Sequence, residues 1–163
     1  MIDHEFISLE AFISSAESFV KISDRIHDDW KFHRDYDKQS YYIKKDTFIK
    51  HADELFKAEF NIFYNLSYGV PSFSFNIWES SGSLLSLEDI RRMSLIEIKE
   101  KDFYSVITQQ EHPVFGRPYF VMHPCQTLEL LASLPDSKNI IVTFLSLITP
   151  LINLKLPLEY GLL

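Results

Sequence analysis

The chain contains one thiol, and its neighbours make it a candidate nucleophile. Cys125, the single cysteine, follows His123 and Pro124 at the end of the apolar run YFVM. Proline cannot continue a ladder of strand hydrogen bonds, so the run should end there and leave the thiol at the start of an exposed loop. A thiolate in such a place can act as a nucleophile, whereas a thiol packed in a core is inert. Both roles remain open from the local sequence alone.

Histidines near the thiol do not settle its role. A protonated His123 would favour the thiolate, whereas a neutral one would bond the backbone, and we favour the structural role. A papain-like thiol hydrolase needs a Cys-His-Asn or Cys-His-Asp set, and no such local signature surrounds Cys125. Zinc would find at most three ligands, in Cys125, His112 and His123, without the usual paired spacing. We therefore expect no metal. The four glycines are not grouped, so we expect neither a phosphate-binding nor a dinucleotide-binding loop.

Composition excludes several classes of protein. The 163 residues carry 23 acidic and 16 scattered basic side chains, a net charge of −7 that gives no footprint for a nucleic-acid backbone. A hydrophobic content of 46% argues against disorder. One cysteine cannot form an intramolecular disulfide, and the N-terminus lacks a signal-peptide pattern. The longest apolar stretch, 139–154, contains Pro150 and is shorter than the roughly 20 residues of a membrane span. We therefore expect a cytosolic protein without a membrane span.

Local patterns predict an α+β fold, in which helices at both ends of the chain flank a run of antiparallel strands. Apolar residues recur at helical spacing over 5–27 and over 138–149, where Pro150 should end the helix. Alternating segments predict strands at 30–36, 41–48, 58–78, 103–109 and 117–123. The long segment should bend at Gly69 and Pro71, and a short helix should follow it. We assign four aromatic residues to the core: Phe73, Phe75, Trp78 and Phe120. No linker is apparent, so residues 1–163 are predicted to form one domain.

Three blocks of the sequence resemble one known family. Residues 107–127, ITQQEHPVFGRPYFVMHPCQT, are similar to the active-site region of the autophagy-related protein ten family, the E2-like enzymes of a ubiquitin-like conjugation system. The form His-Pro-Cys-x-Thr is specific, because the sister E2-like enzyme of autophagy shares only His-Pro-Cys. Residues 68–79 look like the family's Tyr-x-x-Pro strand pair, and residues 143–160 resemble its C-terminal helix and tail. The resemblance covers most of 60–160 and implies an E2-like core with an antiparallel sheet between an N-terminal and a C-terminal helix.

The resemblance also implies an activity. Cys125 matches the family's catalytic cysteine and would accept a ubiquitin-like modifier, autophagy-related protein twelve, from an E1-like activating enzyme as a glycyl thioester. It would then transfer the modifier to a lysine of autophagy-related protein five, an acceptor that the family recognises directly, in support of autophagosome formation. Neither a cofactor nor a nucleic-acid partner is implied. The alternatives are a catalytically silent E2-like module that binds a modifier or partner, and a thiol hydrolase.

One departure from ordinary E2 enzymes concerns the donor that stabilises the oxyanion. Those enzymes carry an Asn after a His-Pro pair upstream of the cysteine, but here Val114 follows His112 and Pro113. An apolar side chain cannot donate a hydrogen bond, so another group must do so. Candidates are Gln109, Gln110, Thr127 and backbone N–H groups beyond Cys125; we favour Thr127 over Gln110, with a purely structural cap as its alternative.

Two further residues complete the candidate site. His112 could tune protonation, although a backbone-bonding role in its turn is an equal alternative. Tyr68 is a candidate contact to the acceptor, although we favour core packing as its role. An exposed apolar strand edge is also expected, because strand addition would allow the enzyme to bind its acceptor without help.

Overall fold

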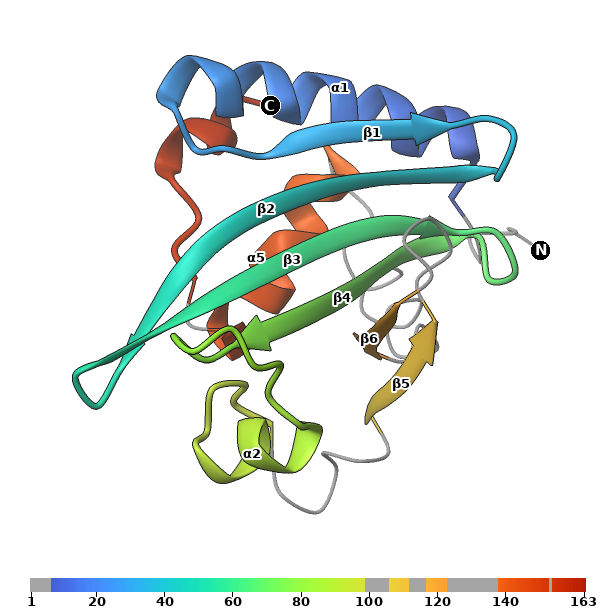
Figure 1. The fold of residues 1–163 in the computed structure, drawn as a ribbon. Helices are drawn as coiled ribbons and strands as arrows, with labels where there is room; N and C mark the ends of the chain where they lie inside the picture. Colours follow the sequence, from blue (N-terminus) through green and yellow to red (C-terminus); the bar gives the residue numbers. More distant parts are fainter. Residues whose placement is uncertain (1–6, 99–105, 112–116, 123–137, 153) are drawn as a thin grey trace.

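The described residues of the computed structural model are 7–98, 106–111, 117–122, 138–152 and 154–163. A helix precedes a run of strands and another helix follows it, as Figure 1 shows. The helices are α1 (Leu9–Ile26), α2 (Leu87–Arg92), α5 (Ile140–Ile152) and the 3₁₀ helix η1 (Leu158–Leu162). The strands are β1 (Lys31–Asp35), β2 (Ser40–His51), β3 (Glu54–Asn65), β4 (Val70–Trp78), β5 (Ile107–Glu111) and β6 (Pro118–Met122). The predicted α+β, E2-like arrangement is confirmed.

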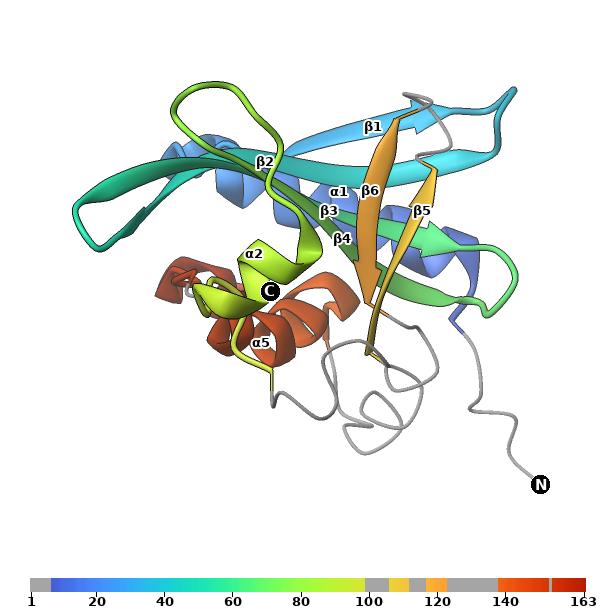
Figure 2. The ribbon, with the colours of Figure 1, turned by 60° about the horizontal axis from the view of Figure 1, so that its bottom comes forward.

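The six strands form one antiparallel sheet in the order β1-β2-β3-β4-β6-β5. Strands β1 to β4 follow chain order because short turns join them. The β2–β3 turn was not predicted: Ala52 and Asp53 both have positive φ there, and the hairpin lengthens both strands beyond their predicted ends. Strand β5 begins at Ile107 rather than at 103, since Val106 is helical. The β5–β6 hairpin meets β4 at an angle, and Figure 2 shows its strands running steeply across β2 and β3.

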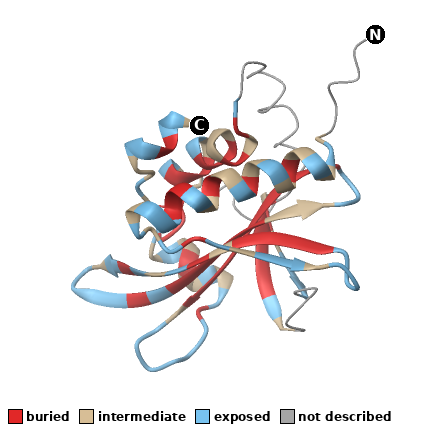
Figure 3. Ribbon diagram, turned by 90° about the horizontal axis from the view of Figure 1, so that it is seen from above, coloured by how far each residue is buried: buried red, intermediate tan, exposed pale blue. Residues whose placement is uncertain are grey.

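Both long helices pack on the same face of the sheet. Alternate side chains of the strands point toward α1 and α5 and form the core, which appears red in Figure 3. Phe73, Phe75 and Phe120 belong to this core, which confirms their predicted positions. The other face of the sheet has no helix over it within the described ranges, and we call it the open face. The two faces therefore impose different chemistry on successive residues of each strand.

Helix α1 begins later than the predicted residue 5 because of its cap. The Ser8 side chain accepts a hydrogen bond from the Ala11 N–H and so satisfies one donor of the first turn. The preceding residue, Ile7, is held in an extended arrangement by two contacts: its N–H donates to the Gly69 carbonyl, and its carbonyl accepts from the Tyr64 hydroxyl. The helix end is fixed by His27, whose positive φ ends the regular turn.

Helix α5 continues through Pro150 to Ile152, so the prediction that it ends at the proline was wrong. Pro150 lacks the N–H that would bond the carbonyl four residues earlier, at a cost to the helix. Tertiary contacts hold the last turn nonetheless: Ile152 is fully buried, and the Leu151 carbonyl accepts from the Glu97 N–H at 2.7 Å. No helix in the described part of the chain is long and apolar enough to cross a membrane.

The C-terminus closes against α1 through a buried tyrosine. Tyr160 of η1 is fully buried and stacks on Phe19, with ring centroids 4.2 Å apart. Its hydroxyl donates to Asp28 at 2.5 Å, and the other oxygen of this carboxylate pairs with Lys45 at 2.6 Å. Burial, followed by the Asp28 carboxylate, raises the pKa of Tyr160, so its hydroxyl remains a donor at neutral pH. The last turn of the chain is thus tied to the sheet and to α1 together.

Replacement of the Tyr160 hydroxyl tests this closure. We expect Tyr160→Phe to lower the free energy of unfolding by about 1–3 kcal/mol, because Asp28 loses a buried hydrogen-bond donor while ring packing is kept. Urea denaturation measures the change. Tyr36→Phe, at an exposed tyrosine, is the matched control and should shift stability by less than about 0.5 kcal/mol. Equal effects of the two substitutions would contradict the described role of Tyr160.

Candidate functional site at the end of β6

The strand β6 fixes where the chain turns toward its thiol. It lies between β4 and β5, and its residues from Tyr119 to Met122 are buried. Cys125 itself lies outside the described residues, but it follows Met122 by three positions. Three residues span at most about 11 Å, so the thiol-bearing residue must lie close to this end of β6. The end of β6 therefore defines the candidate site.

The segment that contains Cys125 is held at both ends. Its start is fixed by β6, and its end reaches Asn139, which caps α5. The Asn139 side chain accepts from the Val142 N–H at 3.1 Å and donates to the Ser15 carbonyl of α1 at 3.0 Å. Its side chain is almost fully buried. The two anchors belong to the sheet and to the helical layer, so the segment between them joins both layers of the fold.

Four predicted site residues lie outside the described residues: His112, His123, Cys125 and Thr127. Their proposed roles therefore remain predictions.

Gln110 lies on β5, at a distance from the end of β6. It pairs with Tyr119, three residues before Met122, which separates it from that end by about 10 Å along the strand. Its exposed side chain donates to the Thr108 hydroxyl at 3.3 Å. The neighbouring Tyr119 is buried, and burial raises its pKa to about 12. Gln110 thus lies in the half of the paired strands farther from the end of β6 and Gln109 at their middle, and a role for either at the thiol remains a prediction.

Tyr68 lies at the same end of the sheet as the exit from β6. Strands β4 and β6 are antiparallel with Ser74 opposite Val121, so residues before Ser74 lie on the same side as residues after Val121. Tyr68 occupies the turn just before β4, where its N–H bonds the Asn65 side chain and 43% of its surface is exposed. The favoured role of core packing is therefore wrong, and contact with an acceptor remains a prediction.

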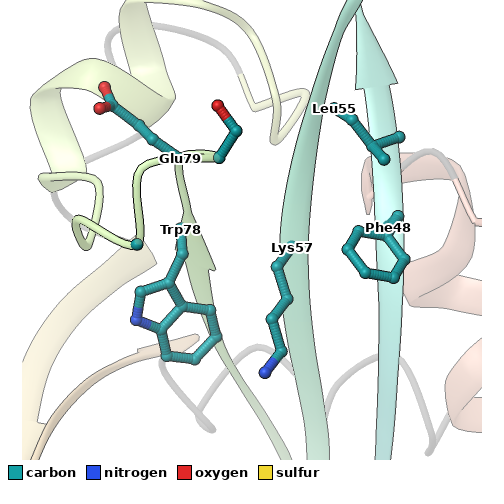
Figure 4. Close-up of a pocket in the computed structure, with 7 residues that line it drawn as sticks. Phe48, Leu55, Lys57, Trp78 and Glu79 are labelled. Carbon is teal, nitrogen blue, oxygen red and sulfur yellow. The ribbon is translucent and has the colours of Figure 1, made fainter.

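Trp78 occupies a groove rather than the core position that was predicted. It lies on the open face, at the opposite end of β4 from Tyr68, and is partly exposed. The groove measures about 610 Å³ and is lined by Phe48, Leu55, Lys57, Trp78, Glu79, Ser80 and Gly82. In Figure 4 the side chains of Lys57 and Trp78 lie beside each other on neighbouring strands, with the ammonium 5.6 Å from the ring centroid. A side chain at this end of β4 cannot contact groups at the exit from β6.

The edges of the sheet are polar, contrary to the expected apolar strand edge. The outermost strands among the described residues are β1 and β5. The exposed residues of β5 are Gln109, Gln110 and Glu111, while β1 exposes charged side chains. Two exposed apolar residues that line one groove, Phe48 and Leu55, lie instead on the β2–β3 hairpin. Strand addition at an apolar edge therefore has no support in this structure.

A buried ion pair on the open face connects β6 to the rest of the sheet. Glu59 of β3 is only 4% exposed, and both of its carboxylate oxygens accept from Arg117, at 2.8 and 2.7 Å. Lys44 of β2 adds a second cation at 3.4 Å. Burial alone would raise the pKa of Glu59, but the Arg117 hydrogen bonds and the Lys44 charge together outweigh it and hold the pKa below its usual value. The carboxylate is therefore charged at neutral pH.

Sequence reasoning missed Glu59 and Arg117 because they are 58 positions apart and only the strand register brings them together. A lone Glu in an alternating strand has the same pattern as a solvent-facing residue. The site has no candidate metal position among the described residues, since no three acidic, His or Cys side chains converge there. The chemistry that the site can support depends on the thiol of Cys125, which lies outside the described residues and follows the end of β6 by three positions.

Comparison with known proteins gives a consistent result. The sequence model of the autophagocytosis-associated protein, active-site domain family matches residues 11–159. The chain is 28% identical to the ubiquitin-like-conjugating enzyme ATG10 of Homo sapiens over 213 aligned positions, which span 99% of this chain and 95% of that protein. It is 30% identical to the Arabidopsis thaliana and Dictyostelium discoideum proteins of the same name, over 62% of this chain and about half (51% and 52%) of theirs. The resemblance inferred from residues 107–127 is thereby confirmed.

The lowered pKa of Glu59 predicts a specific pH dependence of stability. The pair contributes its full stability above the usual glutamate pKa of 4.5, and this contribution is lost as the pH falls through the lowered value. Glu59→Gln should lower the free energy of unfolding by about 1–3 kcal/mol at pH 7, through the loss of its hydrogen bonds from Arg117. The difference from wild type should shrink between about pH 5 and 3, because the native carboxyl then becomes neutral. Urea titrations over this range measure it.

Asp46→Asn is the matched control for the pH series. Asp46 also lies near Lys44, at 3.7 Å, but its side chain is 54% exposed. Its loss should change stability by less than about 1 kcal/mol at any pH. Parallel stability profiles for wild type and Glu59→Gln would show that the carboxylate of Glu59 is not held charged by its partners.

Proposed function

The chain belongs to the autophagocytosis-associated active-site domain family, and from this premise we propose that it carries a ubiquitin-like modifier on Cys125. The enzyme is an E2-like conjugating enzyme of autophagy. The modifier that we propose is autophagy-related protein twelve, received from an E1-like activating enzyme, and the acceptor is a lysine of autophagy-related protein five. We further propose that residues 1–163 form one catalytic domain that acts in the cytoplasm. The observation that carries the proposal is the family's His-Pro-Cys-x-Thr form at residues 123–127.

The proposed reaction consists of two acyl transfers. In the first, the Cys125 thiolate attacks the carbonyl carbon of the modifier's C-terminal glycine, a C–S bond forms, and the thiolate of the E1-like enzyme leaves. In the second, the neutral amine of the acceptor lysine attacks the same carbon. An amide bond forms, the Cys125 thiolate leaves, and the amine loses a proton. Each step passes through a tetrahedral oxyanion that requires a hydrogen-bond donor.

The described scaffold supports these steps in two ways. The described residues on both sides of Cys125 belong to packed elements, because Met122 is buried at the end of β6 and Asn139 at the start of α5 donates to the Ser15 carbonyl of α1. Tyr68 is exposed at the same end of the sheet and is proposed to contact the acceptor. Thr127 is proposed to donate to the oxyanion in place of the missing Asn, with Gln110 as a less favoured donor. His123 is proposed to bond the backbone, and tuning of protonation around the thiol is the alternative role for His123 and for His112.

The covalent role of Cys125 has a direct test. Incubation with the E1-like enzyme, ATP and the modifier should give an adduct that reductant removes, and Cys125→Ala should give none. Cys125→Ser should form a more stable oxyester, or no adduct, and stall before the acceptor lysine. Non-reducing electrophoresis measures these outcomes, and thermal denaturation confirms that the variants fold. An adduct that persists in Cys125→Ala, or normal product from Cys125→Ser, would rule out the carrier role.

The proposed role of Thr127 separates the two steps. If its hydroxyl stabilises the oxyanion during aminolysis, Thr127→Ala should slow transfer to the acceptor by about tenfold to 100-fold and leave loading unchanged. Single-turnover assays of loading and of discharge measure the two rates separately. Thr127→Ser keeps the hydroxyl and is the matched control, expected to transfer at nearly the wild-type rate. Equal slowing of loading and discharge would identify Thr127 as a structural cap instead.

A further inference from the structure

Backbone pairing alone attaches the β5–β6 hairpin weakly to the sheet. Among the described residues, β4 and β6 share two residue pairs, whereas β2 and β3 share ten and β3 and β4 share nine. The end of β6 leads directly to the segment that contains Cys125. An attachment of two pairs leaves a five-residue strand free to pivot unless side chains restrain it.

Side chains supply that restraint at the other end of β6. Arg117 immediately precedes the strand, and its Nη2 atom donates to both oxygens of Glu59. Strand β4 lies between β3 and β6 in the sheet, so this ion pair reaches across an entire strand. On β4 itself, Asn76 lies opposite Glu59 and donates from Nδ2 to the Pro118 carbonyl at 3.0 Å. Two strands, β3 and β4, thereby contact the first residue of β6 and the residue before it.

The burial of the Glu59 carboxylate strengthens this restraint on β6. Its side chain is 6% exposed, so a charge at this position would be costly without a cation in contact. The Lys44 ammonium lies 3.4 Å from the Glu59 carboxylate, but it belongs to β2, on the other side of β3 from β6. Among the described residues, Arg117 is therefore the cation that ties the carboxylate to the hairpin. The Arg117 guanidinium also lies 5.4 Å from the Trp78 ring centroid, which limits its freedom further.

We propose that Glu59 and Arg117 are positioning residues that fix β6 on the sheet and thereby set the place at which Cys125 is presented to its acyl donor and acceptor. This inference rests on the proposed function only for the role of Cys125. The strand transmits the constraint, because its five residues span about 16 Å between the clamped end and the end that leads to the thiol. A shift of even about 1 Å at the reacting atoms can slow a reaction about 100-fold.

Two measurements on the same variants test the proposal. The variants are Glu59→Gln, Arg117→Met and Arg117→Lys, with Arg92→Met as the matched control, because Arg92 makes an exposed ion pair with Asp89 at 2.8 Å. Native-state hydrogen exchange should show the amides of β5 and β6 accelerated about tenfold more than those of β2 and β3 in Glu59→Gln and Arg117→Met, beyond the acceleration of all strands that a lower global stability causes. Single-turnover discharge of the charged enzyme to the acceptor should show kcat about tenfold lower with KM unchanged.

Arg117→Lys provides the conservative rescue. Both hydrogen bonds to Glu59 come from one nitrogen of Arg117, so a lysine ammonium can replace them, and this variant should recover most of the exchange protection and of kcat. Arg92→Met should change neither quantity.

Three results would overturn the proposal. These are unchanged exchange in β5 and β6, equally faster exchange in all strands, and faster exchange confined to β5 and β6 with unchanged kcat. If the wild-type protein is never charged, the proposed function fails and the link to Cys125 with it. The exchange measurement would still decide whether the pair fixes β6, since it needs neither modifier nor E1-like enzyme.

Discussion

A negative charge buried in the middle of β3 constrains the strand on which the proposed chemistry depends. Glu59 cannot remain ionised under so little solvent without cations in contact, and Arg117 and Lys44 supply them. Because Arg117 belongs to the β5–β6 hairpin, the need to neutralise the carboxylate also determines where that hairpin lies. The backbone contributes little to the same attachment within the described part of the chain, where β4 and β6 share two residue pairs. The ion pair between Glu59 and Arg117 on the open face thus strengthens the attachment of the β5–β6 hairpin to β4, which few backbone pairs provide.

The two faces of the sheet have different roles, apolar packing on one and polar contacts on the other. The face toward α1 and α5 provides stability through apolar packing, and the C-terminal Tyr160 closes that layer onto Asp28. The open face carries the polar contacts that orient β6. An enzyme that passes an acyl group between large protein partners needs this division, because its thiol must remain accessible while the strand that presents it stays fixed.

Much of the fold follows from local sequence, and the exceptions have physical causes. The helical spacing before His27 and the aromatic alternation around Phe73 and Phe75 predicted the helix and the core, because local periodicity reports which face is buried. The β2–β3 turn was missed because Ala52 and Asp53 carry no strong turn signal. The end of α5 was predicted too early, at Pro150, because tertiary contacts of the last turn outweigh the hydrogen bond that the proline removes from the helix.

The candidate site divides in the same way. Cys125 was identified from its motif, whereas Glu59 and Arg117 depend on a register across three strands that no local pattern contains. Trp78 was assigned to the core because an aromatic residue in an alternating strand gives no sign of which face it occupies, and the register places it in a groove.

Site mapping of the charged enzyme by mass spectrometry tests the central claim most directly. The protein is charged with E1-like enzyme, ATP and modifier, digested without reductant, and treated with neutral hydroxylamine, which cleaves thioesters but not amides. The account predicts that the modifier's C-terminal glycine is attached to the peptide containing Cys125 and that hydroxylamine releases it. Attachment to a lysine of this chain, resistant to hydroxylamine, would contradict the account.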